Sequence, residues 1–166
     1  MSELLRVSYL ELTRAPAPAP AHTGPECIAC EKLAVEEYLD LYQRIGAQVR
    51  WDQRLQMPRA ALIELLQSAR DQLYVLRDER RQILGFCEFE RVGEEAELKN
   101  FGLIAAAQGR GLGTWLLRTA LHHEWSQRPA RIWLHTDNWD HGAALHMYQS
   151  AGFRIYQLCD EPPGEL

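Results

Sequence analysis

The sequence predicts an α/β sandwich in which a mixed β-sheet is flanked by helices, and three observations support this fold class. Strand-like and helix-like runs alternate along the chain. Three strand-like runs in its middle are joined by short polar connections, which favour an antiparallel meander. The chain has 166 residues, 46% of them hydrophobic and 25% charged, enough for the core of a globular protein. We therefore expect a single domain over residues 1–166.

The N-terminal part is expected to hold one strand and two helices. Residues 4–14 are rich in strand formers and predict the first strand. Residues 15–25 contain four prolines and a glycine and predict an extended, exposed and mobile crossing. Apolar side chains recur at helical spacing at Val35, Tyr38, Leu39, Tyr42 and Ile45, which predicts a helix, and Gly46 is expected to end it. After a short linking segment around Trp51, Arg54 and Leu55, a second helix begins at Pro58 and buries Leu62, Leu65, Leu66 and Ala69.

The second half is expected to hold the meander, followed by alternating helices and strands. The meander strands are predicted at 72–77, 83–92 and 96–104. After a glycine-rich turn we expect a helix at about 112–126, a strand at 131–136, a helix at about 141–151 and a strand at 153–158. Residues 160–166 contain a Pro-Pro-Gly run and are expected to form a disordered tail.

The balance of charge argues against two classes of partner. Eighteen basic and 23 acidic residues give a net charge of −5 without a long basic stripe, which disfavours a protein that works on nucleic acid or on an anionic membrane. No apolar run approaches the length of a membrane helix, and the N-terminus has no secretory pattern. We therefore expect a soluble, cytoplasmic protein.

The cysteines do not form the pattern of a metal site. Cys27 and Cys30 make an isolated C-x-x-C pair, whereas Cys87 and Cys159 stand far apart. A structural zinc site needs a second ligand pair at short spacing. His22 lies upstream and could be recruited, but reduced cysteines in or beside a strand are the favoured interpretation, so we predict no metal.

The glycine-rich turn at 108–113, Gln-Gly-Arg-Gly-Leu-Gly, carries the clearest chemical signal, because it lies between a strand and a helix. Free backbone N–H groups at a helix start, reinforced by the helix dipole, form a site for phosphate oxygens. Glycine lets the backbone approach the anion, and Arg110 adds charge at the rim. The glycine spacing is neither that of the dinucleotide fingerprint nor that of the nucleoside-triphosphate loop.

With this turn, the chain resembles the GNAT superfamily of acyl-CoA-dependent N-acetyltransferases. A strand, then Gln-x-x-Gly-x-Gly, then a helix is similar to that superfamily's acyl-CoA signature, and residues 144–153 resemble its A-x-x-x-Y-x-x-x-G-F element. The order of the predicted elements agrees. The resemblance covers residues 70–158 well and residues 33–69 in outline, whereas the N-terminal strand and proline segment match more loosely.

The resemblance implies a GNAT fold with splayed strands at the site of acetyl-CoA, the co-substrate. The diphosphate would lie on the backbone of Gly109, Arg110, Gly111, Leu112, Gly113 and Thr114, and Gln108 would also bind the cofactor. The pantetheine arm would pair with the strand backbone at Phe101, Gly102 and Leu103. Family members often contact the cofactor through an Asn seven residues before the tyrosine. His141 stands there in this sequence, so that contact is changed or missing.

Two residues are candidates for acid–base catalysis. An amine is mostly protonated near neutral pH, so a general base and a proton donor for the departing thiolate are useful. Tyr148 matches the family's usual donor, although packing against Phe153 would also explain its ring. Glu97 matches the catalytic glutamate of the histone-acetyltransferase branch, although an ordinary strand carboxylate is an equal alternative. Strand alternation would place Glu97 on the face that holds Lys99, Phe101 and Leu103.

Several other side chains are weaker candidates for the site. His135 is expected near the substrate end of the opening, although a partly buried structural histidine is the alternative interpretation. If Glu97 is not the base, His135 or a chain of waters is the next candidate. The loop residues Asp137, Asn138, Asp140 and His141 would contact substrate or cap the next helix. Tyr38, Tyr42 and Trp51 would form an acceptor wall or simply pack in the core.

The leading interpretation is an N-acetyltransferase that transfers an acetyl group from acetyl-CoA to a primary amine by direct attack in a ternary complex. The amine would belong to a small molecule or to a protein. The alternative is a non-catalytic GNAT-fold protein that senses CoA or serves in an assembly. The sequence leaves the acceptor, the acyl chain and the oligomeric state open, a homodimer included.

Overall fold

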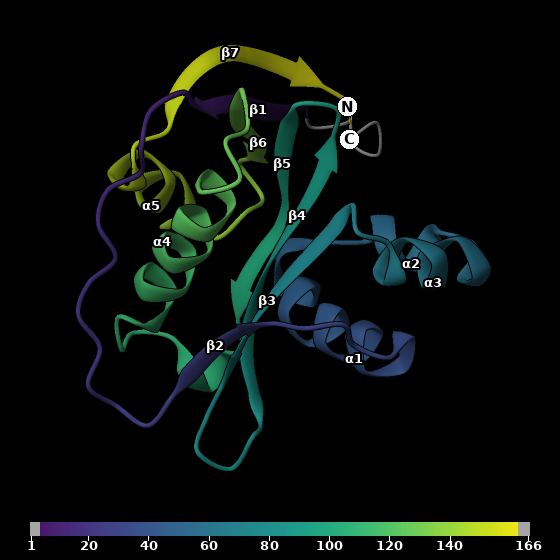
Figure 1. Ribbon diagram of the computed structural model, residues 1–166. Helices are drawn as coiled ribbons and strands as arrows, with labels where there is room; N and C mark the ends of the chain where they lie inside the picture. Colours follow the sequence, from purple (N-terminus) through teal and green to yellow (C-terminus); the bar gives the residue numbers. More distant parts are fainter. Residues whose placement is uncertain (1–3, 163–166) are drawn as a thin grey trace.

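The computed structural model describes residues 4–162, within which seven strands form one mixed sheet with helices on both faces (Figure 1). The strand order is β2-β3-β4-β5-β6-β1-β7. The strands are β1 (Leu5–Leu12), β2 (Cys27–Cys30), β3 (Asp71–Arg77), β4 (Ile83–Val92), β5 (Glu95–Leu103), β6 (Arg131–Asp137) and β7 (Arg154–Glu161). The helices are α1 (Val35–Gly46), α2 (Gln53–Gln56), α3 (Arg59–Gln67), α4 (Leu112–Trp125) and α5 (Ala144–Ala151). The predicted α/β sandwich is confirmed.

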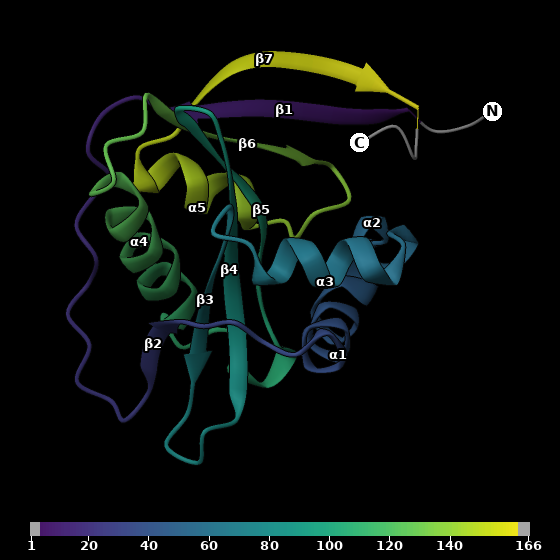
Figure 2. The same cartoon turned by 45° about the vertical axis from the view of Figure 1, so that its right-hand side comes forward.

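Two hydrophobic cores lie on opposite faces of the sheet. Helices α1, α2 and α3 lie on one side of it and α4 and α5 on the other, as the two views show (Figure 2). On the first side Tyr38 and Tyr42 of α1 pack with Phe86 of β4. On the second, Leu116 and Leu117 of α4 pack with strand residues that include Leu98, Ile132 and Leu134. No helix between residues 4 and 162 has the length and apolarity needed to cross a membrane.

Strand pairing confirms the meander and adds a strand that the sequence pattern did not reveal. Strands β3, β4 and β5 pair antiparallel in order. The four-residue strand β2 pairs with β3, so Cys27 and Cys30 lie in an edge strand, both exposed. The N-terminal strand β1 lies between β6 and β7 and is antiparallel to both. Such pairing between chain segments far apart in sequence leaves no local pattern.

Several predicted boundaries were wrong. Helix α3 begins after Pro58 and ends at Gln67, so Ala69 lies outside it, and part of the linking segment forms the one-turn helix α2. Helix α5 begins at Ala144 rather than at 141. Strand β7 continues to Glu161, where we expected a disordered tail from residue 160, because its last residues still pair with β1. The expected tail at 163–166 lies outside the described residues.

The proline-containing segment is extended, as predicted, but it is held along α4 rather than free (Figure 1). The His22 ring stacks on Trp115 of α4 with 3.8 Å between ring centroids. The backbone carbonyls of Ala17 and Pro18 accept hydrogen bonds from His122 and Arg118 of the same helix, at 3.0 and 3.2 Å. These contacts bring the chain to β2 beside the glycine-rich turn.

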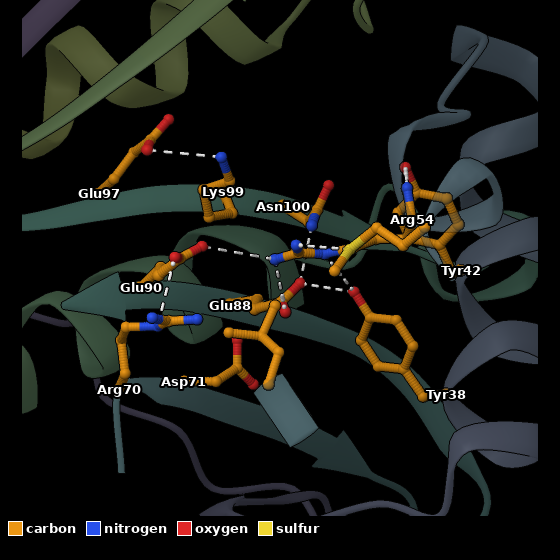
Figure 3. A network of polar contacts seen from close by, with 12 residues as sticks. Tyr38, Tyr42, Arg54, Arg70, Asp71, Glu88, Glu90, Glu97, Lys99 and Asn100 are labelled. Atoms are coloured by element: carbon orange, nitrogen blue, oxygen red, sulfur yellow. Dashed lines mark hydrogen bonds and ion pairs between the residues drawn. The ribbon is translucent and has the colours of Figure 1, made fainter. Parts of the chain in front are cut away.

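A buried charged cluster joins α1, α2, β4 and β5 beneath the first core (Figure 3). The Glu88 carboxylate is fully buried and accepts hydrogen bonds from Arg54, Tyr38 and Asn100, at 3.1, 2.7 and 2.7 Å. Burial alone would raise the pKa of Glu88, but the Arg54 guanidinium and these hydrogen-bond donors hold it below the ordinary value. Glu88 is therefore ionised and fixes side chains from three other elements.

The neighbouring Asp71 carboxyl behaves in the opposite way. It is buried at the start of β3 beside Glu88, and no N–H group or hydroxyl of residues 4–162 donates a hydrogen bond to either of its oxygens. Burial and the charge of Glu88 raise the pKa of Asp71 to about 9. One acid of this cluster is thus charged and the other neutral at pH 7, because two adjacent buried carboxylates cannot both ionise at low cost.

Asp71→Asn should raise the free energy of unfolding at neutral pH. Between pH 3.8, its ordinary pKa, and about 9 the folded state holds a proton that the unfolded chain has released. The stability that Asp71 contributes is therefore complete below its ordinary pKa and is lost as the pH rises towards 9. In urea titrations, the free energy of unfolding of the variant minus that of the parent should grow by up to about 1.4 kcal/mol per pH unit between about pH 5 and 8.

Asp40→Asn, an exposed change on α1, is the matched control and should leave the pH dependence of stability unchanged. A constant difference between Asp71→Asn and the parent across this range would show that Asp71 is ionised in the fold.

Candidate functional site

The site is an opening between the parallel strands β5 and β6. Their pairing is confined to the first three residues of each, from Glu95 with Arg131 to Glu97 with Trp133. Beyond this point β6 continues beside β1, whereas β5 continues beside β4. The backbone of β5 from residue 100 onward therefore borders an opening rather than β6, and its polar groups on that side are available to a ligand.

A β-bulge in β5 accompanies this divergence. In the ladder between β4 and β5, Glu88 pairs with Asn100 and Phe89 pairs with Leu98, so Lys99 is an extra residue. An extra residue bends its strand and increases the local twist. The bulge thus lies where β5 leaves β6.

The bulge also overturns the predicted alternation of side chains along β5. Leu98 packs in the core beneath α4, and so do Phe101 and Leu103, which strict alternation would place on the opposite face from Leu98. One extra residue at Lys99 shifts the alternation by one. The prediction that Glu97 shares a face with Phe101 and Leu103 was therefore wrong.

A cavity of about 420 Å³ fills the opening. It is lined by most of the residues that were predicted to bind the cofactor: Phe101, Gly102, Leu103, Gln108, Gly109, Gly111, Gly113, Thr114 and His141. Two predicted residues of the turn do not line the cavity. Leu112 is buried in the core, and Arg110 donates a 2.6 Å hydrogen bond to Glu26, which lies at the end of the proline-containing segment.

The glycine-rich turn at the wall of this cavity has the geometry of an anion site. Gly109 and Gly111 have φ of +76° and +77°, and Gly111 is the N-cap of α4. A Cβ atom at either glycine would meet no atom within 4 Å, so each faces open space. Backbone N–H groups at the start of α4 and its dipole favour negative charge there. The turn therefore has room and favourable charge for an anionic group such as a phosphate.

Tyr148 of α5 is buried in the wall of the cavity. Its ring packs against Phe101 and Phe153, with centroids 6.2 and 6.1 Å away, so the expected packing is present. The residue also lines the cavity, and no hydrogen bond from its hydroxyl group is found within residues 4–162. Burial, followed by the charge of Asp140, raises the pKa of Tyr148 well above its ordinary value. The hydroxyl group therefore keeps its proton and can act as a donor.

A second cavity of about 470 Å³ meets the first. Its wall includes the aromatic side chains of Tyr42, Trp51 and Trp139, whereas Tyr38, the third residue of the predicted acceptor wall, is buried and bound to Glu88. The two cavities share six lining residues, which we call the junction: Val49, Trp51, Lys99, Asn100, His135 and Asp140.

Two junction residues are held by hydrogen bonds. The Asn100 amide nitrogen donates to Glu88, which turns its carbonyl oxygen away from Glu88 (Figure 3). The Asp140 carboxylate accepts hydrogen bonds from the Thr136 hydroxyl and the Asp137 N–H, so it stabilises the loop rather than the start of α5. Asn100 was not among the predicted site residues. The polar Glu88 within an apolar run of β4 was the available signal for it.

Glu97 lies next to the junction residues Lys99 and His135 but outside the junction itself. It lines neither cavity, and its carboxylate oxygens are 3.4 Å from Lys99 Nζ and 3.8 Å from His135 Nε2. His135 lies at the junction itself, and burial lowers its pKa below the ordinary value. Between residues 4 and 162 no group of three or more His, Cys, Asp or Glu side chains is arranged to hold a metal ion.

Comparison with known proteins agrees with this geometry. Residues 29–153 match the model of the acetyltransferase (GNAT) family. The structure is similar to a GCN5-related N-acetyltransferase from Sphaerobacter thermophilus, with a TM-score of 0.62 and 18% identity over 98% of this chain and 53% of that one. It thus spans about half the length of that relative.

Two shorter structures are matched over most of their length. The ribosomal-protein-S18-alanine N-acetyltransferase from Escherichia coli has a TM-score of 0.61 and 21% identity, over 79% of this chain and 80% of that one. The IAA acetyltransferase from Bacillus cereus has a TM-score of 0.60 and 21% identity, over 80% and 79%. No curated protein matches the sequence. Because the family match covers well over half of the chain, the protein belongs to the acetyltransferase (GNAT) family.

Proposed function

We propose that this protein is an N-acetyltransferase that transfers an acetyl group from acetyl-CoA to a primary amine by direct attack in a ternary complex. One observation carries the proposal: two cavities meet at a shared junction between splayed strands. A glycine-rich anion site borders only the first cavity. The first cavity would hold the acyl-CoA, and the second would admit the amine.

The residues of the first cavity suit the two ends of the donor. Gly109, Gly111 and the start of α4 would bind the diphosphate through backbone N–H groups. On the side of β5 that β6 leaves free, the backbone N–H and C=O groups of residues 101–103 would form hydrogen bonds with the amide groups of the pantetheine arm. Both contacts use the backbone, so they depend on the path of the chain more than on side-chain identity.

Tyr148 would supply the proton that the departing sulfur needs. It lines the first cavity near the junction residue Asp140, and its raised pKa keeps it protonated throughout the physiological pH range. A thiolate is a better leaving group when a donor stands beside it. The amine nitrogen attacks the carbonyl carbon of the thioester, the C–S bond breaks, and the sulfur takes the Tyr148 proton.

Acetyl-CoA should stabilise the protein, and Gly111→Val should abolish this effect. Ligand at 100 times its Kd adds about 2.7 kcal/mol to the free energy of unfolding, which appears as a rise in Tm. A valine at Gly111 would place its side chain in the open space where the diphosphate would lie.

Gly93→Val is the matched control, because Gly93 also has positive φ, at +59°, with open space around it, but lies in the turn between β4 and β5. Both variants should lose stability through backbone strain, and only Gly93→Val should keep the response to acetyl-CoA. No rise in Tm for the parent at millimolar acetyl-CoA, or an equal response of both variants, would contradict the proposed diphosphate site.

Tyr148→Phe should lower turnover by about 10²-fold and leave the Kd for CoA nearly unchanged, because it removes the hydroxyl and keeps the packed ring. The measurement is release of free thiol from acetyl-CoA with a panel of amines and amino acids, together with CoA titration by calorimetry. Tyr156→Phe, exposed on β7, is the control and should match the parent. Unchanged turnover in Tyr148→Phe would restrict Tyr148 to packing. Tight CoA binding without turnover on any amine would favour a CoA-binding sensor.

A further inference from the structure

We infer that His135 is the general base of this reaction and that Glu97, behind it, is a positioning residue. The inference rests on the proposed acetyl transfer and assigns a step that the site had left open. The family resemblance suggests Glu97 as the base, with an ordinary strand carboxylate as an equal alternative and His135 as the next candidate.

Position separates the two residues. A base must reach the attacking nitrogen directly or through one water, and the nitrogen must pass from the second cavity to the first. His135 lines both cavities, whereas Glu97 lines neither. Of the six junction residues only His135 and Asp140 carry a side chain that can take up a proton near pH 7. The Asp140 carboxylate is already engaged by Thr136 and Asp137.

The ring nitrogens of His135 are free for this task. Neither has a hydrogen-bond partner in the part of the chain that the structure describes, residues 4–162. Nε2 lies 3.8 Å from a Glu97 carboxylate oxygen, which is beyond hydrogen-bond range but close enough to attract an imidazolium. Glu97 would thus orient the ring and stabilise the protonated form, while the other nitrogen, Nδ1, accepts the proton.

The groups around His135 come from four strands. Glu97 and Lys99 belong to β5, Asp137 to β6, Glu161 to β7, and the Tyr9 ring of β1 lies 5.8 Å away between centroids. Burial and the Lys99 charge lower the pKa of His135, whereas the three carboxylates raise it, and the net direction is downward. The imidazole is therefore neutral at pH 7 and able to accept a proton.

The proton balance of the reaction closes with His135 and Tyr148. The acceptor ammonium gives one proton to His135, which releases it to solvent. The free amine attacks the thioester carbonyl carbon, and the nitrogen of the tetrahedral adduct loses a second proton to solvent as the C–S bond breaks. The sulfur takes one proton from Tyr148, which then recovers one from solvent. The products are the amide, the thiol of CoA and one released proton.

The test compares the pH dependence of kcat/KM in His135→Gln, Glu97→Gln and the parent, with the amine that turns over fastest in the panel. His135→Gln should be at least about 10²-fold slower near pH 7, with an unchanged Kd for CoA, and should recover above about pH 9 as the amine loses its own proton. Glu97→Gln should be slowed less, about tenfold, and its acid limb should move to lower pH, because a carboxylate that raises the pKa of His135 is gone.

His146→Gln, an exposed histidine of α5 outside both cavities, is the matched control and should equal the parent. His135→Asn is the second variant if His135→Gln fails to fold. NMR titration of the His135 ring should give a pKa below 6.5 in the parent and a lower one in Glu97→Gln, without any need for an acceptor.

Two results would overturn the inference while acetyl transfer stands. In the first, kcat/KM of His135→Gln equals that of the parent at every pH. In the second, Glu97→Gln loses more activity than His135→Gln and its acid limb does not shift, which would make Glu97 the base. A parent protein that binds no acetyl-CoA, or that acetylates no amine, would instead overturn the proposed function and the inference with it.

Discussion

The site depends on the divergence of β5 from β6 beside the extra residue Lys99. Strands β5 and β6 pair over only three residues, and β5 then follows β4 while β6 follows β1. The divergence opens the first cavity and leaves the β5 backbone at 101–103 without a strand partner on that side. The bulge also turns Phe101 and Leu103 into the core beneath α4 and leaves Asn100 facing the buried Glu88. In a regular β4–β5 ladder the side chains that follow Lys99 would point to the opposite faces of the sheet.

The buried cluster around Glu88 fixes the other wall of the opening. Breaking a buried ion pair is costly because it strands a charge, whereas the intact pair adds little net stability. Its effect here is geometric: Arg54 of α2, Tyr38 of α1 and Asn100 of β5 all converge on one carboxylate. The short helix α2, which has few residues of its own to bury, is thereby held against the sheet. The neutral Asp71 beside it avoids a second buried charge.

Local signals predicted the elements and the cofactor wall from the sequence, because helical periodicity, glycine turns and short hairpin connections act within a few residues. Most residues of the glycine-rich turn line the first cavity, and so does Tyr148. Long-range features escaped prediction. The pairing of β1 between β6 and β7, the strand β2 and the continuation of β7 to Glu161 depend on partners far away in sequence. The bulge at Lys99 has no local signature, so the face of Glu97 was misjudged. The hydrogen bond from Arg110 to Glu26 likewise joins residues far apart in sequence.

The central claim is that an acyl-CoA lies in the opening between β5 and β6, and amide hydrogen exchange tests it most directly. Addition of CoA should slow exchange at the backbone amides of 101–103 and of 109–114, since the pantetheine arm and the diphosphate would cover them. Exchange in β7, at the far edge of the sheet, should stay unchanged. Protection confined to other segments, with residues 101–103 and 109–114 exchanging as fast as in the free protein, would contradict the account.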